Sequence, residues 1–364
     1  MQQGQETQNA RGHFRHGLHW AAAISISGVC LWLAFRQIHW SDVGASLAQL
    51  DARPLALGVV AVLATTATKA ARWQILLRHA KIRTSVRRVF RILVIGQMGN
   101  SFLPARLGDL ARAVLLRRQA PSGTAAALGT IAAEKILDGM TGMLVILYLT
   151  TTRHLPDWLR WPSLVALAIS AALIALLVLA LALPQSGVGL RVLFAHRLHQ
   201  GSRADSASFA QARKRISDLA QQFLHGLRVL ASPSALVPGF CLSVAAWGLG
   251  IATNQIVLAA AGVHVPIWTN TLVVIAVYLA TFLPAAPAQI GVFEYACLLA
   301  LGTALVPAET ALTFGLLLHV VVYAPPALLG PVYTIVEGLS WSSLRISQFD
   351  GVFGQAEGSD APLP

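Results

Sequence analysis

Long apolar runs, separated by short polar and basic connections, dominate this sequence. Runs of about 18 or more apolar residues are long enough to cross the ~30 Å hydrocarbon core of a bilayer as a helix. Charged residues make up only 12% of the 364 residues, whereas ordinary soluble domains contain about 25%. The pattern argues against a large soluble helical protein and predicts an all-α, polytopic helical bundle in a membrane.

The predicted spans are residues 18–35, 55–77, 124–150, 163–183, 236–261 and 311–336. The first is expected to be a retained helix, because no small-residue cleavage site follows it. Lys69, Arg72 and Trp73 lie near the end of the second span, where they are expected to reach the membrane interface.

The chain is expected to form one transmembrane domain over residues 18–338, preceded by a cytoplasmic tail over 1–17. Within it, residues 184–232 form a polar cytoplasmic connection, and the periodicity of 209–230 predicts an amphipathic surface helix. Residues 339–364 are polar and are expected to be a disordered tail.

Two apolar stretches are too short to cross a membrane. The first, residues 92–104, contains four residues that disfavour a helix: Gly96, Gly99, Asn100 and Pro104. A further glycine, Gly108, follows it and is expected to belong to the same break. The second consists of residues 268–283 and 293–306, joined by a break with Pro284, Pro287 and Gly291. Apolar stretches of this length are typical of re-entrant segments, which survive only when buried in protein or lining a wet cavity.

The distribution of lysine and arginine among the loops predicts the orientation of the chain in the membrane. With a cytoplasmic N-terminus, the inside loops at 78–91, 105–118 and 184–232 hold six, four and seven Lys/Arg, and the outside loops far fewer. The two short stretches then enter from opposite faces, and both contain Phe-Leu-Pro-Ala. Interrupted segments in the two halves point to an inverted-repeat transporter and its binding site; a chance match of four residues is the alternative.

Three charged residues, Glu134, Lys135 and Asp138, lie inside the span at 124–150. Glu134 and Asp138 share one helix face, and Lys135 points ~100° away from Glu134. One interpretation places them near the cytoplasmic end, paired with loop arginines. The favoured interpretation is a polar site facing the bundle interior, because a charge at the bilayer centre costs about 2.5–3.5 kcal/mol and marks function.

Polar residues also surround both breaks. At the first, Arg106, Asp109 and Arg112 recur at three-residue intervals near Asn100, which suits either phosphate binding by arginine forks or a salt-bridge cluster that fixes a helix. At the second, Gln289 and Glu294 flank Gly291. A helix starting there favours an anionic group at its N-terminus, with simple capping by Glu294 as the alternative.

Other function classes find little support. Nucleophile-elbow, zincin and P-loop motifs are missing, so neither an enzyme nor a nucleotide cofactor is indicated. Cys30, Cys241 and Cys297 lie in apolar spans without metal-ligand spacing and are expected to be packing residues, as is His319. The net charge is +12, and the basic residues lie mainly in the loops between the apolar spans. This distribution favours contact with anionic lipid rather than with nucleic acid.

Three segments resemble the lysylphosphatidylglycerol synthase transmembrane-region family: residues 97–118, 134–139 and 282–294. The resemblance covers roughly residues 15–340. The first family motif is carried by Asn100, Leu103, Pro104, Arg106, Gly108, Asp109 and Arg112. The others appear as Glu134-Lys135-Ile136-Leu137-Asp138 and as Pro287-Ala288-Gln289-Ile290-Gly291 with Glu294. Asp109, Lys135 and Ala288-Gln289 depart from the family's usual glutamate, arginine and glycine pair.

The resemblance implies a multi-pass protein of the bacterial inner membrane that translocates or binds a lipid or lipid-linked head group. Phospholipids, hopanoids and polyprenyl-linked head groups are the expected partners, and a homo-oligomer or a lipid-synthesis enzyme is a further candidate partner. In the family a separate soluble domain makes the aminoacylated lipid, and no such domain is expected here. The alternatives are a membrane-embedded transferase acting on a lipid carrier and a non-transporting partner of lipid-synthesis enzymes.

Overall fold

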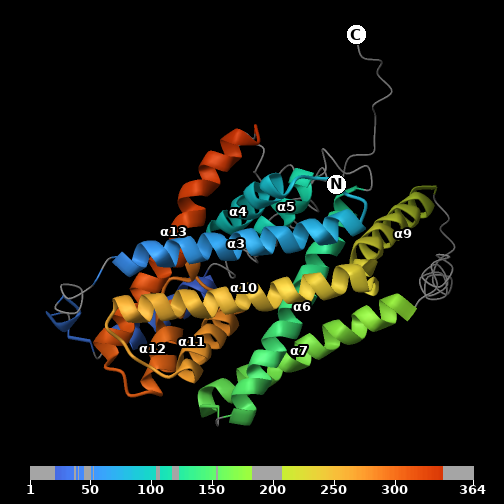
Figure 1. Ribbon diagram of the computed structural model, residues 1–364. Helices are drawn as coiled ribbons and strands as arrows, with labels where there is room; N and C mark the ends of the chain where they lie inside the picture. Colours follow the sequence, from blue (N-terminus) through green and yellow to red (C-terminus); the bar gives the residue numbers. More distant parts are fainter. Residues whose placement is uncertain are drawn as a thin grey trace, which may run out of the picture.

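The computed structural model describes residues 21–36, 38–39, 41–44, 51, 53–103, 107–116, 123–152, 155–182 and 207–338. Within these ranges the chain is helical and contains no strand, which confirms the all-α prediction (Figure 1). Four helices are long and apolar enough to cross a membrane: α3 (Arg53–His79), α7 (Asp157–Ala182), α10 (Pro233–Ala260) and α13 (Ala308–Val336). The protein is therefore a multi-pass membrane protein. The predicted N-terminal and C-terminal tails lie outside the described residues.

Helices α3 and α10 lie side by side along most of their length (Figure 1). Contacts pair early residues of α3 with late residues of α10: Gly58 lies against Val257, and at the other end His79 meets Ser234, with Nε2 and Oγ 3.1 Å apart. The two helices are thus antiparallel, and together they form one wall of the bundle.

The first short apolar stretch belongs to a longer helix, α4 (Val86–Phe102), whose N-terminus is capped by Ser85. The prediction that Gly96 and Gly99 break the helix is wrong. Helix α5 (Leu107–Leu116) runs back along α4, and Gly108 lies inside it rather than at a break. A Cβ at Gly108 would collide with the carbonyl oxygen of Gly96 and would lie 2.6 Å from the Asn100 nitrogen. These glycines therefore serve close helix packing.

The predicted span at 124–150 is a 30-residue helix, α6 (Gly123–Thr152). Helix α9 (Ala207–Leu227) confirms the predicted helix in the connection and is followed by the short 3-10 helix η3 (Arg228–Ala231). Glycines bring α6 and α9 together, because a Cβ at Gly226 would collide with the carbonyl oxygen of Ala126. α9 is thus packed firmly on α6.

The second short stretch forms two helices, α11 (Ile267–Ala280) and α12 (Val292–Gly302), with the single-turn η4 (Pro287–Gln289) between them. Here the predicted break is confirmed: Ala288, Gln289 and Gly291 have φ of 57°, 64° and 89°. Such left-handed values end a regular helix. Re-entry into the membrane remains a prediction for both segments.

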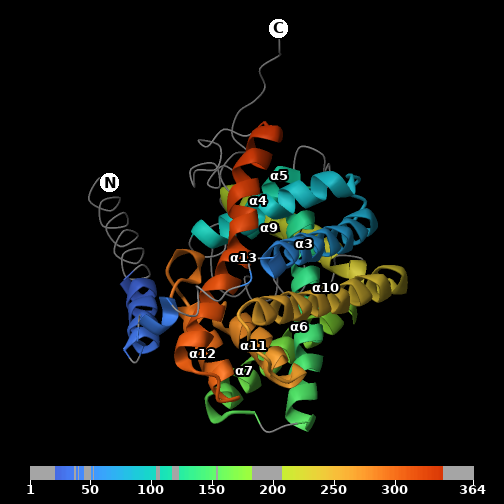
Figure 2. The same cartoon turned by 60° about the vertical axis from the view of Figure 1, so that its left-hand side comes forward.

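The two interrupted segments meet, because η4 contacts α4. The helix Ala21–Phe35 closes the break from the edge of the bundle, beside α12 (Figure 2). There Ser27 Oγ accepts a hydrogen bond from the backbone nitrogen of Ala286 at 2.8 Å. Large apolar clusters surround these contacts, one around α3, α4 and α6 and another around α11, α12 and α13.

Candidate functional site

Arg72, about two turns before the end of α3, is fully buried, with no exposed surface. It donates hydrogen bonds to Glu134 and Asp138 of α6 and to Ser243 Oγ of α10, the last at 2.6 Å. The prediction that Arg72 reaches the membrane interface is therefore wrong. The reason lies in the tertiary structure, because the carboxylates of Glu134 and Asp138 on α6 face Arg72. Their negative charges compensate for the cost of burying the guanidinium.

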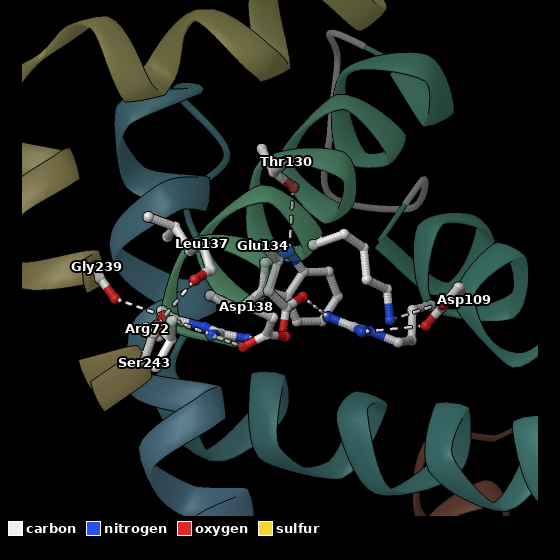
Figure 3. Close-up of polar contacts among 12 residues, drawn as sticks. Arg72, Asp109, Thr130, Glu134, Leu137, Asp138, Gly239 and Ser243 are labelled. Atoms are coloured by element: carbon white, nitrogen blue, oxygen red, sulfur yellow. Dashed lines mark hydrogen bonds and ion pairs between the residues drawn. The ribbon is translucent and has the colours of Figure 1, made fainter. Parts of the chain in front are cut away.

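Glu134 links two arginines (Figure 3). Its Oε1 accepts from Arg72 Nη2 at 2.9 Å, and its Oε2 accepts from Arg112 Nη2 of α5 at 2.6 Å. This confirms that Glu134 faces the bundle interior. Helix α6 thereby ties the α4–α5 pair to α3 through one carboxylate.

Asp109 continues the network toward the surface. It accepts from Arg112 at 3.3 Å and from Asn100 Nδ2 at 3.2 Å, and it forms an ion pair with Lys135 Nζ at 3.1 Å. Side-chain exposure rises along this path from 0% at Arg72 to 6% at Arg112, 17% at Asp109 and 44% at Lys135. The network is therefore a continuous polar path from the bundle interior to its surface.

Trp73 packs against the network and contacts Arg112. It is fully buried, and Arg112 stacks on its ring with the guanidinium carbon 4.0 Å from the ring centre. Its Nε1 donates to Thr130 Oγ1 of α6 at 3.1 Å. The expected interfacial position of Trp73 is wrong, because the ring packs between α3, α5 and α6 as a platform for a cation.

Three buried polar atoms of the network have no hydrogen-bond partner within the described ranges: Arg72 Nε, Arg112 Nε and Asn100 Oδ1. Two of them are cationic N–H donors. The arginines therefore retain capacity for a further acceptor, of the kind that a phosphate or carboxylate oxygen supplies.

The structure thus brings together Asn100, Asp109, Arg112, Glu134, Lys135 and Asp138 from the predicted site. Arg106 and Pro104 lie outside the described residues. Glu294 belongs to a separate pair: it accepts the backbone N–H of Gly291 at 2.7 Å and meets His319 Nδ1 of α13 at 2.5 Å. The capping of α12 by Glu294, which was the alternative interpretation, is thus observed, and a role of Glu294 in substrate binding stays a prediction.

Gln289 lies half-buried in η4, where its backbone N–H donates to the carbonyl oxygen of Ala286 at 2.9 Å. Its side chain forms no hydrogen bond or ion pair within the described part of the chain. Sequence reasoning missed Arg72, Trp73 and Ser243 as members of the site. The sequence did contain a sign of Arg72's role, because Arg72 is a basic residue inside an apolar helix. Glu134 and Asp138, inside another span, need such a counter-charge.

A possible ligand set for a metal lies away from this network. Among the described residues, His39, Asp42 and Glu309 bring their side-chain ligand atoms within 4.8 Å of one another, and two of the three are exposed. Exposed acidic groups of this kind are common without an ion, so we assign no metal site there.

The family model for the lysylphosphatidylglycerol synthase TM region matches residues 20–330, which include the whole network and both interrupted segments. Comparison with curated proteins and with solved structures gave no match. The network of arginines and carboxylates in this helical bundle is thus set in a chain that belongs to the lysylphosphatidylglycerol synthase TM region family.

Proposed function

We propose that the protein translocates a phosphate-bearing lipid head group between the leaflets, with the network from Lys135 to Arg72 as its polar path. The observation that carries this proposal is the continuous rise in exposure from buried Arg72 to half-exposed Lys135. Ionisable groups within a membrane bundle are costly and commonly line substrate pathways.

The unequal contacts of Arg112 suggest how a head group enters. Arg112 lies 2.6 Å from Glu134 but 3.3 Å from Asp109, which is also the more exposed carboxylate. Asp109 is therefore the partner that is more easily displaced. A phosphate arriving at the surface meets Lys135 first, replaces Asp109, and then engages Arg112 with a bidentate geometry that suits arginine.

The arrangement of helices supports the same function. Both interrupted segments belong to this part of the bundle, and η4 of the second contacts α4 of the first. Binding sites of inverted-repeat transporters lie where such interrupted segments meet. Membership of a lipid-related membrane family supports a lipid as the substrate class. The inner membrane of a bacterium, with a cytoplasmic N-terminus, is the proposed location.

The test is a flipping assay in proteoliposomes, in which dithionite bleaches fluorescent lipid only in the outer leaflet. Labelled phosphatidylglycerol and phosphatidylcholine are compared with labelled ceramide, which lacks a phosphate. We expect the protein to extend bleaching beyond the outer leaflet for the two phospholipids and not for ceramide.

Lys135→Met is the matched variant, because this half-exposed residue can be changed without burying an unpaired charge. We expect Lys135→Met to slow phospholipid flipping and Lys135→Arg to preserve it. Arg160→Met is the control, since Arg160 forms an ion pair with Asp157 that is away from the network and more exposed than the pair of Lys135 and Asp109. Wild-type flipping rates in Lys135→Met, or equal bleaching with and without protein, would refute the proposal.

A further inference from the structure

A separate groove lies between α3, α4 and α13, with a cavity volume of about 370 Å³. Its lining is apolar on the α3 and α13 sides and basic at the start of α4: Ala67, Ala70, Phe90, Tyr333, Arg87 and Arg91. The rings of Phe90 and Tyr333 meet edge to face, with centres 6.2 Å apart. Sites for small ligands have volumes of this order.

The basic rim of this groove carries uncompensated charge. Arg88 and Arg91 share a single carboxylate, Glu337, at 3.0 and 2.7 Å. Arg87 precedes both of them in sequence and is exposed, and within the described part of the chain its side chain forms no hydrogen bond or ion pair. Among the described residues three cations therefore face one anion, and Arg87 is the one whose guanidinium is left to bind a ligand.

The start of α4 adds to this positive potential. Val86 is the first residue of α4, and its first turn contains no acidic residue. A helix N-terminus carries a partial positive charge of about half a unit. An aspartate or glutamate near the N-terminus would offset this charge, whereas α4 begins with Arg87 and Arg88. The rim thus combines the Arg87 guanidinium with a helix terminus that is capped by Ser85 but has no acidic side chain in its first turn.

We propose that this groove binds one anionic phospholipid, with its phosphate at Arg87 and the upper part of an acyl chain against Ala67, Phe90 and Tyr333. A small soluble anion would leave the apolar walls unused. A zwitterionic lipid would bring its own cation to a rim that already has two in excess. Basic pockets between helices at the cytoplasmic side, where the loop arginines predict this rim to lie, are typical sites for acidic lipid head groups.

This site is distinct from the polar path of the proposed translocation. Ala70 and Arg72 are two positions apart on α3, which places them about 200° apart around the helix. Ala70 lines the groove, whereas Arg72 binds Glu134 on another side of α3. The groove and the network share no residue, so lipid binding at the groove can be measured whether or not the protein moves lipid across the membrane.

The experiment is native mass spectrometry of the full-length purified protein in a mild detergent, titrated with dioctanoyl phosphatidylglycerol or dioctanoyl phosphatidylcholine. We expect one phosphatidylglycerol to bind in preference to phosphatidylcholine. Arg87→Gln should weaken phosphatidylglycerol binding about fivefold, the factor that corresponds to about 1 kcal/mol for one cation near a membrane surface. Arg83→Gln is the matched control, because Arg83 is exposed nearby but does not line the groove.

A second variant tests the apolar wall without changing charge. Ala67→Leu should fill the groove and weaken phosphatidylglycerol binding. Inorganic phosphate, a free anion that competes by charge alone, should not displace the lipid. Equal losses in Arg83→Gln and Arg87→Gln would overturn the proposal, as they would show diffuse attraction to the basic loop. Unchanged binding in Ala67→Leu, or displacement by phosphate, would overturn it as well.

Discussion

Arg72 and Glu134 form an ion pair of 2.9 Å in the interior of the bundle, although 62 positions separate them in the chain. Neither charge could remain there alone, because removing an ion from water costs several kcal/mol even after relaxation. Each therefore depends on the packing of α3 against α6. Glu134 also binds Arg112 of α5. The position of the α4–α5 segment therefore depends on the packing of α3 against α6 as well.

Neutralising Glu134 should be strongly destabilising. Glu134→Gln keeps the shape of the side chain but leaves Arg72 and Arg112 without their shared counter-charge, and breaking a buried pair in this way costs about 3–5 kcal/mol. We expect a clearly lower midpoint of thermal unfolding in detergent, measured by intrinsic tryptophan fluorescence.

Asp157→Asn provides the comparison for Glu134→Gln. Asp157 also pairs with an arginine, but its side chain is 97% exposed, and an exposed pair contributes about 0–1 kcal/mol. Its unfolding midpoint should stay close to that of the wild type. Similar losses in the two variants would show that burial of Glu134 has no special importance.

Adding one methyl group at Gly108 should separate α4 from α5. A Cβ there would collide with the carbonyl oxygen of Gly96 and crowd Asn100, and overpacking of this kind costs about 1–3 kcal/mol. Gly108→Ala should therefore lower stability and loosen Asp109 from Asn100. The measurement is the same unfolding assay, combined with protease sensitivity of the α4–α5 segment.

Gly248→Ala is the matched control for this substitution. Gly248 lies within α10, and a Cβ there would have no neighbour within 4 Å. Replacing a helical glycine with alanine then stabilises by about 0.5–1 kcal/mol. Opposite signs for the two variants are expected, and a loss of stability in Gly248→Ala would contradict the packing argument.

His319 should stabilise the second break through Glu294. Its Nδ1 contacts one oxygen of Glu294, while the other oxygen holds the Gly291 N–H at the start of α12. His319→Phe fits between Phe293 and Tyr323 but leaves one carboxylate oxygen unpaired, at a cost of about 1–3 kcal/mol. We expect increased hydrogen exchange at the start of α12, whereas His264→Gln on an exposed connection should have no effect there.

The charge distribution predicts that the loop before α4 lies in the cytoplasm and the loop before α11 outside. Single cysteines at Arg83 and His264, in a chain whose native cysteines are replaced by alanine, test this orientation. In right-side-out vesicles a membrane-impermeant maleimide should label His264→Cys directly. Arg83→Cys should react only after the vesicles are opened, and the reverse pattern would invert the proposed topology.

Most of the fold class was predictable from the sequence. The length of an apolar run is set by the thickness of the bilayer, so α3, α10 and α13 could be placed within about three residues of their ends, whereas α7 begins about six residues before the predicted start. The break before α12 was predictable too, because Pro287 has no backbone N–H to donate and Gly291 readily adopts a positive φ, whatever surrounds them. These features depend on local chemistry alone.

In the α4–α5 segment, local helix propensity predicted the wrong backbone. Gly96 and Gly99 have low helix propensity, which predicted a break, yet α4 continues through both. The tertiary contact with Gly108 decides the outcome, because the backbone of α5 approaches closely only where α4 has no side chain. Propensity is a difference of about 1 kcal/mol and is readily overridden by packing.

The sequence by itself determined that the chain forms a helical membrane bundle and that Glu134 and Asp138 share a helix face that needs a counter-charge. Only the tertiary structure decided that Arg72 supplies that charge and that Trp73 supports Arg112. The periodicity of one helix gives the direction of its own side chains, but the partner of a buried charge comes from whichever helix packs against it. That choice depends on how α3, α5 and α6 assemble.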